Sequence, residues 1–461
     1  MLEPYKSRQA HMTLIASTSG VRGIIGTGIT PQIVTNYAAA FGTWLKKGKV
    51  VIGRDSRPSG NIYIRAAIAG LTSVGIDVID LGIVPTPTVE IAVHDLKAAG
   101  GICITASHNP AQWNAMKFFN ARGEFITPEQ YQQFSAIYEF GKYDFRPFNK
   151  LGKVTTQDGW IRTHIRKTLA VKTVNRAAIK RAKFRVVVDC INGAGSTALP
   201  LLLEELGVRV IRINCEGDGN FVREPEPIPK NLTQVGKVVK QKKAHCGLVT
   251  DPDADRLAIV DELGRPIGEE LTLAIAVKQV LKKQKGPTVI NLSTSKVTAD
   301  TAESCGSKVY YSKVGESNVV QMMREKKAII GGEGNGGVIY PSFHAGRDSL
   351  IAAALVLSHL AEEKLTMSRL ADSLPTYYTE KAKGALSGDF SARLAAFETT
   401  ARELIGDYTV DRRDGLRFDF SAGWVQIRTS NTEPIFRVIV ETNNKTLTGE
   451  LTATVMSRFM A

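Results

Sequence analysis

Short runs of β-branched and other apolar residues alternate with longer helical patterns through most of the chain. Strand-like runs at residues 50–52, 77–80 and 101–104 are accompanied by helical patterns at 30–46 and 62–75. The arrangement repeats with strand-like runs at 185–189, 209–213 and 246–249, and again at 288–291, 308–311 and 328–330. Such alternation is typical of βαβ units. It predicts an α/β protein with three tandem mixed-sheet βαβ domains.

The C-terminal part has a different pattern. Residues 417–420 and 424–427 alternate apolar with polar positions, and a further apolar run follows at 436–440. This period of two is typical of an antiparallel sheet with one covered face. We therefore expect a C-terminal α+β domain that ends in a helix. The predicted domains are 12–150, 151–262, 263–373 and 374–461.

Length and composition fit this division. The 461 residues suffice for about three domains of ordinary size. With 43% hydrophobic and 23% charged residues, wholesale disorder is excluded. The longest apolar run, residues 350–357, is far shorter than the ~20 residues that span a bilayer, and no signal peptide is visible, so we expect a cytoplasmic protein without a membrane segment. His11 stands before a plausible start at Met12, so residues 1–11 are left out of the fold prediction.

The net charge of +14 fits polyanions or phosphorylated metabolites as partners, or simply keeps the protein in solution. The basic residues occur in short, scattered groups, without a long basic tail or an aromatic-basic RNA motif. The five cysteines are an odd number and contain no CxxC pair, so neither a disulfide framework nor a structural zinc site is predicted.

Four polar segments stand out, one in each predicted domain, each directly after an apolar strand. The first is the serine loop, residues 105–110 (TASHNP). Ligands of open α/β sheets bind outside the carboxyl ends of the strands, and this loop can expose a serine hydroxyl there. A strand-ending turn with local hydrogen bonds is the alternative. The loop lacks the G-x-S-x-G pattern of hydrolases.

The second segment is the aspartate loop, residues 251–256 (DPDADR). Three carboxylates at alternate positions of an extended loop point toward one side and suit Mg²⁺. They repel one another unless a cation joins them, although a purely structural role stays open. An EF-hand is disfavoured because Arg256 stands where that loop requires glycine, even though Glu262 falls at its twelfth position.

The third segment is the glycine loop, residues 331–337 (GGEGNGG), and the fourth is the arginine loop, residues 428–434 (RTSNTEP). Glycines let a backbone approach a ligand closely, and Glu333 and Asn335 can hydrogen-bond to hydroxyls. The glycine loop does not match a Walker loop and could be a flexible turn. Arg428 followed by hydroxyl and amide side chains suits a phosphate dianion, with a polar hairpin turn as the alternative.

In this order the four segments resemble the α-D-phosphohexomutase family, from about residue 18 to residue 459. The serine loop is similar to the family's phosphoserine loop, and the aspartate and arginine loops to its metal and phosphate loops. Residues 18–23 (TSGVRG) and 53–57 (GRDSR) also resemble family segments. One departure is in the sugar loop, where many members have G-E-x-S-G-H. Here Asn335 and Gly337 replace the serine and the histidine, and His344 is a candidate substitute, with a structural role as its alternative.

The resemblance implies a central cleft in which a phosphoryl group passes reversibly between the 1- and 6-oxygens of a hexose phosphate, through a phosphoserine and a bisphosphorylated sugar. Ser107 would carry the phosphoryl group, and Mg²⁺ would be held by Ser107, Asp251, Asp253 and Asp255. The other implied roles fall into two groups. Substrate would be bound by Glu333, Asn335, Arg428, Ser430, Asn431 and Thr432. Proton transfer or electrostatic help would come from Arg22, His108, Lys117, Arg256 and Lys313.

The resemblance favours glucosamine phosphate as substrate, with a dual glucose and mannose phosphate mutase as the alternative. We expect a monomer or homodimer that binds neither nucleic acid nor membrane. A nucleic-acid-binding protein would fit the charge but leaves the three aspartates unexplained. A dinucleotide enzyme would need G-x-G-x-x-G after the first strand, and no such unit is present.

Overall fold

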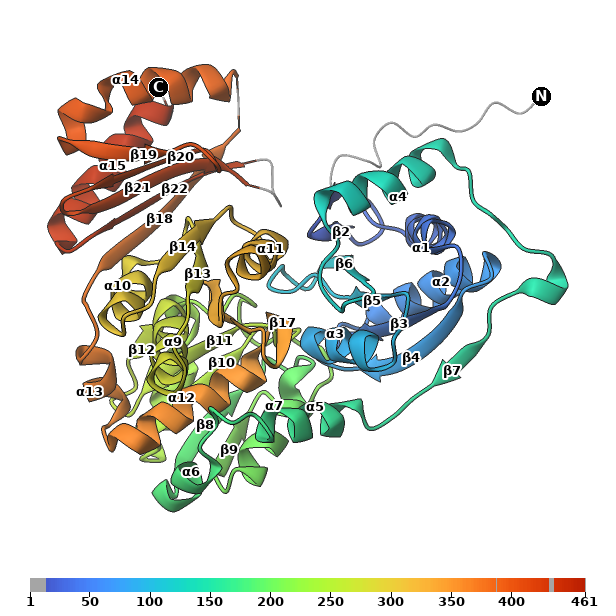
Figure 1. The fold of residues 1–461 in the computed structure, drawn as a ribbon, viewed down its shortest axis with the longest axis horizontal. Helices are drawn as coiled ribbons and strands as arrows, with labels where there is room; N and C mark the ends of the chain where they lie inside the picture. Colours follow the sequence, from blue (N-terminus) through green and yellow to red (C-terminus); the bar gives the residue numbers. More distant parts are fainter. Residues whose placement is uncertain (1–13, 387, 431–434, 461) are drawn as a thin grey trace.

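A computed structural model describes residues 14–386, 388–430 and 435–460. It contains four β-sheets that follow one another along the chain (Figure 1), the first at the right of the view and the last at the upper left. Three sheets are mixed and the fourth is antiparallel throughout, so the predicted fold class is confirmed.

The first sheet has seven strands in the order β1-β2-β6-β5-β3-β4-β7. They are β1 (Ile15–Ser17), β2 (Gly20–Ile24), β3 (Lys49–Arg54), β4 (Asp77–Ile83), β5 (Gly100–Ile104), β6 (Trp113–Asn120) and β7 (Val154–Thr156). Its helices are α1 (Pro31–Leu45), α2 (Gly60–Ser73), α3 (Thr86–Asp95) and α4 (Pro128–Phe140). Successive residues of β3 face opposite ways, because Val50 packs with α1, α2 and α4, whereas Val51 packs with α3.

Each sheet together with its helices is called a unit below. The starts of two helices in the first unit follow from the local sequence. Thr30 caps α1 by accepting a hydrogen bond from the Ile33 amide, and Pro31 occupies the first helical position. Thr127 and Gln130 form a capping box at the start of α4.

The second sheet has the order β12-β11-β10-β8-β9. Its strands are β8 (Arg185–Asp189), β9 (Arg209–Ile213), β10 (Cys246–Thr250), β11 (Leu257–Asp261) and β12 (Pro266–Gly268). The helices of this region are α5 (Trp160–Leu169), α6 (Arg176–Ala182), α7 (Gly195–Glu205) and α8 (Thr233–Gln241), with short 3₁₀ helices η1 (Phe148–Lys150) and η2 (Pro229–Asn231). Strand β7 pairs with β4 and strand β12 with β11, so both short strands pair across the domain limits expected from the sequence.

The third sheet has the order β14-β13-β15-β16-β17. Its strands are β13 (Thr288–Asn291), β14 (Val309–Ser312), β15 (Ile330–Glu333), β16 (Gly337–Tyr340) and β17 (His344–Arg347). Its helices are α9 (Glu270–Lys283), α10 (Lys296–Ser304), α11 (Glu316–Lys326), α12 (Ser349–Glu363) and α13 (Met367–Asp372).

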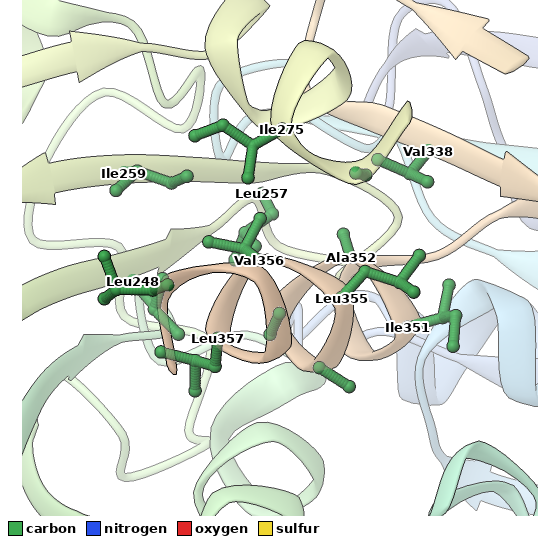
Figure 2. Packing of buried hydrophobic residues seen from close by; sticks show 14 of the residues in the cluster. Leu248, Leu257, Ile259, Ile275, Val338, Ile351, Ala352, Leu355, Val356 and Leu357 are labelled. Atoms are coloured by element: carbon green, nitrogen blue, oxygen red, sulfur yellow. The ribbon is translucent and has the colours of Figure 1, made fainter. Parts of the chain in front are cut away.

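The apolar run at 350–357 lies in α12, at the junction of the second and third sheets. Figure 2 shows Ile351, Leu355 and Val356 of this helix among side chains from both units. Leu248, Leu257 and Ile259 come from the second sheet, and Ile275 and Val338 come from α9 and β16. Within the described residues, no helix combines the length and the apolar character needed to cross a bilayer.

The fourth sheet has the order β18-β22-β21-β20-β19. Its strands are β18 (Tyr378–Ala385), β19 (Tyr408–Asp411), β20 (Leu416–Phe420), β21 (Gly423–Thr429) and β22 (Ile435–Thr442), with helices α14 (Phe390–Ile405) and α15 (Lys445–Met460). Ile427 and Val438 face the core beneath the helices. Arg428 and Ile439, one position further along, face the cleft described below.

Candidate active site

One cleft receives side chains from all four units. The sequence-predicted residues that line it are Arg22, Ser107, His108, Lys117, Arg256, Glu333, Asn335, Arg428 and Ser430. The three aspartates of the aspartate loop are buried next to it. Asn431 and Thr432 lie outside the described residues.

Ser107 lies in the turn after β5, and its backbone has a φ of 48°. Non-glycine residues seldom adopt this left-handed conformation unless their surroundings hold it. Here the Ser107 amide donates to Thr105 Oγ1 (3.0 Å), and Arg57 Nη2 donates to the Ser107 carbonyl (3.0 Å). The Ser107 hydroxyl itself donates to Asp251 Oδ2 at 2.8 Å. The serine and aspartate loops are therefore in direct contact.

Asp55 supports this turn from beneath. Its Oδ2 accepts hydrogen bonds from Arg57 Nη1 and Thr105 Oγ1, each at 2.6 Å. Asp55 and Arg57 are both buried. The sequence indicated the strand and turn that carry Asp55 and Arg57 but no role for either residue. The contact of Asp55 with Thr105 and that of Arg57 with Ser107 exist only after β3 and β5 pair.

The aspartate loop gathers three buried carboxylates. One oxygen from each of Asp251, Asp253 and Asp255 lies within 4.8 Å of the others. Among contacts within the described residues, Asp253 Oδ1 and Asp255 Oδ1 are buried without a hydrogen-bond partner. Burial raises the pKa of Asp251 well above its usual value, and the charges of Asp255 and Asp253 raise it further. Crowded carboxylate oxygens of this kind can hold a divalent cation.

Basic side chains surround the carboxylates. Lys117 on β6 donates to Asp253 Oδ2 (2.5 Å) and Asp255 Oδ2 (3.1 Å). Burial opposes the charge of Lys117, but the two aspartates outweigh it and raise the pKa of its ammonium group. Arg256 donates its amide to Asp251 Oδ1 (3.3 Å), and its Nε lies 3.7 Å from Asp255 Oδ1.

His108 and Arg22 lie on the other side of the serine loop. His108 Nδ1 is 3.4 Å from the Ser107 hydroxyl oxygen. Burial lowers the pKa of His108 well below its usual value, and the charges of Arg256 and Arg22 lower it further, so the imidazole is neutral at pH 7. Arg22 donates to Asn109 Oδ1 (3.2 Å) and to the Ser19 carbonyl (3.1 Å).

The glycine loop begins inside a strand instead of after one, because β15 runs to Glu333 and the loop turns directly into β16. Glu333 Oε1 accepts from Asn291 Nδ2 (2.8 Å) and the Gly315 amide (3.0 Å), and Oε2 accepts from Arg347 Nη1 (2.8 Å). Asn335 Oδ1 accepts from the Gly337 amide (3.1 Å). The Glu333 carboxylate is thus held in one orientation at the cleft wall.

Arg347 was not predicted as a site residue. Its Nη2 donates to Asp255 Oδ2 (2.7 Å) and its Nε to Glu316 Oε2 (2.9 Å), in addition to the Glu333 contact. Burial opposes its charge, but these three carboxylates outweigh burial and raise the pKa of Arg347 well above its usual value. Arg347 and Glu316 both line the cleft. The motif patterns could not reveal this cluster, because its members lie 14 to 92 positions apart.

The arginine loop also begins inside a strand, since Arg428 belongs to β21. Arg428 is buried, and its Nε donates to Asp414 Oδ1 (3.1 Å). Its Nη2 is buried without a hydrogen-bond partner in the part of the chain that the structure describes. A guanidinium with a donor to spare can bind a phosphate oxygen.

Two residues that the sequence suggested for the site, Lys313 and His344, do not line the cleft. Lys313 is exposed, although the next residue, Val314, does line the cleft. His344 Nε2 lies 3.0 Å from Asp348 Oδ2, and its Nδ1 lies 3.5 Å from Glu90 Oε2. These contacts favour the structural role of His344, because both ring nitrogens face carboxylates outside the cleft lining.

Known proteins are similar to most of the chain. Family models of phosphoglucomutase/phosphomannomutase match residues 13–144 (alpha/beta/alpha domain I), 163–264 (domain II), 269–378 (domain III) and 379–457 (C-terminal domain). A phosphoglucomutase/phosphomannomutase of Thermococcus kodakarensis is 38% identical, and the match covers 94% of this chain and 96% of the relative. A probable phosphoglucosamine mutase of Methanopyrus kandleri is 34% identical and covers 94% and 95%.

A solved structure is also similar over nearly its full length. The phosphoglucomutase/phosphomannomutase family protein of Burkholderia thailandensis has a TM-score of 0.82 and 25% identity, covering 98% of this chain and 97% of that chain. The chain therefore belongs to the phosphoglucomutase/phosphomannomutase family and is an isomerase of the phosphohexomutase type.

Proposed function

We propose that the protein interconverts the 1-phosphate and the 6-phosphate of a hexose through a phosphoserine at Ser107 and a bisphosphorylated sugar. One observation carries the proposal. The Ser107 hydroxyl, which is 2.8 Å from Asp251, lines the same cleft as Glu333 and Arg428. A phosphoryl carrier, a carboxylate for sugar hydroxyls and a guanidinium for a phosphate then face one space, which is the arrangement that this reaction needs.

The aspartate loop supports a metal ion in this reaction. Asp253 Oδ1 and Asp255 Oδ1, which accept no hydrogen bond within the described residues, fit a cation, and we propose Mg²⁺ held by these two residues, Asp251 and the Ser107 phosphate. When bound, Mg²⁺ would neutralise negative charge on the transferring phosphoryl group. Arg256, whose Nε is 3.7 Å from Asp255, adds positive charge from the protein itself.

Phosphoryl transfer also requires an exchange of protons. As the bond between phosphorus and Ser107 Oγ breaks, the free sugar oxygen forms the new bond and loses its proton, and Oγ takes one up. The neutral imidazole of His108, 3.4 Å from Oγ, can accept the proton that the sugar oxygen loses, and the imidazolium so formed can give it to Oγ. Lys117 donates to Asp253 and Asp255 and contributes positive charge beside the proposed metal site.

The second half of the reaction reverses the first. The bisphosphate turns over in the cleft and returns its other phosphate to Ser107. Arg428, with Ser430 beside it, would bind whichever phosphate is not reacting, and Asn431 and Thr432 would complete that site. Glu333 would bind a sugar hydroxyl in both orientations.

We propose glucosamine phosphate as the preferred sugar, with glucose and mannose phosphates as the alternative. The Methanopyrus relative, named a probable phosphoglucosamine mutase, supports the first, and the Thermococcus relative supports the second. With one donor on Oε2 and two on Oε1, the Glu333 carboxylate has room on Oε2 for one further donor among its described contacts. A hydroxyl that all three sugars share can fill it, so this loop alone does not choose among them.

A coupled assay across the 1-phosphates of glucose, mannose, glucosamine and N-acetylglucosamine tests this function. In Ser107→Ala, turnover should fall on the order of a thousandfold or more for every accepted sugar, because the covalent carrier is lost. Intact-mass and peptide analysis of fresh wild-type protein should place a phosphoryl group on Ser107. Ser135→Ala, on α4 outside the cleft lining, is the matched control and should keep full activity. Full activity of Ser107→Ala would refute the mechanism.

A further inference from the structure

Position 337 has no side chain, although many members of the family have a histidine there. The backbone does not require glycine, since Gly337 is not among the residues with positive φ. Glycine fits this position because there is no room for a β-carbon. A β-carbon at Gly337 would lie 2.2 Å from Cδ and 2.8 Å from Cγ of Arg347. The side chain of Arg347 therefore fills the volume in which a side chain at position 337 would begin.

Pairing of neighbouring strands brings Arg347 to this place. In the antiparallel pair of β16 and β17, Arg347 is opposite Ile339, two residues beyond Gly337. From there its side chain lies against Gly337 and reaches the cleft, where Glu316, Glu333 and Asp255 each accept one of its hydrogen bonds. A guanidinium has five N–H donors, so two of them remain after these three contacts within the described residues.

We propose that Arg347 takes the place of the missing side chain at position 337 and binds the sugar phosphate there, with the N–H groups that its three carboxylate partners leave over. The inference rests on the proposed mutase function and adds a substrate-binding residue to it. Since a guanidinium keeps its proton, Arg347 supplies charge and hydrogen bonds but no proton transfer. Its contacts with Asp255 and Glu333 also fix the distance between the metal-binding and sugar-binding loops.

A purely structural ion-pair cluster would have the same contacts, so the test must separate packing from binding. Packing is tested by Gly337→Ala in the wild-type and Arg347→Ala backgrounds, followed by thermal unfolding. In the wild-type background the added methyl group should lower the melting temperature by several degrees, since it displaces Arg347. In the Arg347→Ala background the loss should be clearly smaller, because only the contact of the added β-carbon with Asn335 Oδ1, at 2.9 Å, remains. If Gly337→Ala lowers the melting temperature equally in both backgrounds, the side chain of Arg347 does not occupy the space next to position 337.

Binding is tested by Arg347→Lys, which keeps the charge and loses the planar fork. We expect kcat/KM for the accepted sugar phosphate to fall on the order of tenfold or more. Guanidinium ion at millimolar concentration should restore part of the activity of Arg347→Ala. Rescue that appears as a lower KM indicates substrate binding, whereas ion pairs re-formed with the three carboxylate partners alone would change kcat. The matched control is Arg324→Ala, which removes an arginine of the same unit that pairs with Glu124 outside the cleft lining. It should stay within about twofold of wild type.

The outcomes separate this inference from the proposed function. Wild-type kcat/KM in Arg347→Lys, or no guanidinium rescue of Arg347→Ala, would overturn substrate binding by Arg347 while the mutase function stands. If the wild-type protein has no mutase activity on any hexose phosphate, the proposed function fails, and this binding role fails with it. The thermal double-mutant comparison would still report on the packing of Arg347 against Gly337.

Discussion

At the scale of single residues, Asp253 combines two tasks. Its Oδ2 accepts hydrogen bonds from Thr86 Oγ1 and Lys117 Nζ, each at 2.5 Å, while its buried Oδ1 has no partner among the described residues. The same carboxylate can therefore hold Lys117 with one oxygen and a metal ion with the other. An asparagine has nearly the same shape but no charge, so the substitution tests the charge alone.

We predict that Asp253→Asn binds a divalent ion at least about tenfold more weakly and is nearly inactive, because one ligand charge is lost. Titration of the purified protein with Mn²⁺, followed by electron paramagnetic resonance, measures the affinity independently of turnover. Asp218→Asn, an exposed aspartate of the second unit, should bind Mn²⁺ like wild type. Unchanged Mn²⁺ affinity in Asp253→Asn, or wild-type turnover after exhaustive chelation, would contradict the metal assignment.

At the scale of elements, the helix α9 begins at the cleft with a charged cluster. Glu270, its first residue, accepts from the Ser295 amide at 3.0 Å and from Lys381 Nζ at 3.3 Å. Burial, together with the charges of Glu269 and Glu441, raises the pKa of Glu270 to about 8 against the opposing charge of Lys381. The folded protein therefore keeps a proton on Glu270 that the unfolded chain releases near pH 4.5.

Stability should depend on pH through this proton. Between about pH 4.5 and 8 the folded state binds more protons than the unfolded state at this position, so the free energy of unfolding falls as pH rises. One group can contribute at most about 1.4 kcal/mol per pH unit. We predict that Glu270→Gln loses less stability than wild type between pH 5 and 8, measured by urea unfolding at each pH. A steeper loss in the variant would contradict the raised pKa.

Some of the strands could be predicted from the sequence, and others could not. Strands β3, β4, β5, β8, β10 and β13 were predicted because buried parallel strands have continuous apolar runs. The strands β6 and β17 were not, although they carry Lys117 and Arg347. β6 pairs antiparallel with both β2 and β5, and β17 pairs antiparallel with β16 at the edge of its sheet. Both strands mix polar with apolar positions, so neither has the pattern of a βαβ unit.

Some residues of the candidate site could likewise be predicted from the sequence, and others could not. The serine and aspartate loops could be found because several unusual residues stand next to one another in the chain. Asp55, Glu316 and Arg347 could not, because their roles depend on contacts with residues far along the chain. The residue that fills the place of the missing histidine illustrates this limit. His344 was the sequence candidate, but the strand pairing brings Arg347 against Gly337 instead.

At the scale of the whole molecule, α12 joins the second and third units. Its residues from Leu350 to Leu357 are all fully buried. They belong to one continuous core that includes strands of both sheets. The helix thus contributes to the core of both sheets at once. The two units should therefore unfold together.

We predict that Leu355→Ala lowers the free energy of unfolding by about 2–5 kcal/mol, since it leaves a cavity in this shared core. The loss should appear in one transition that covers both units, followed by calorimetry and by hydrogen exchange of amides in β10 and β15. Leu263→Ala removes the same atoms from a side chain that is 48% exposed, and it should cost much less. Separate transitions, only one of them shifted, would contradict a common core.

The fourth unit is attached in another way. Hydrogen bonds join it to the third unit, from the Val314 amide to Asp414, from the Ser293 hydroxyl to Gln426, and from the Lys296 amide to Glu441. When such groups separate, water takes the place of each partner, so the net cost is only about 1 kcal/mol per bond. No solvent can replace the apolar contacts of α12 in this way. Under the proposed function, exchange of these hydrogen bonds for bonds to water would let the fourth unit move relative to the third while the bisphosphate turns in the cleft.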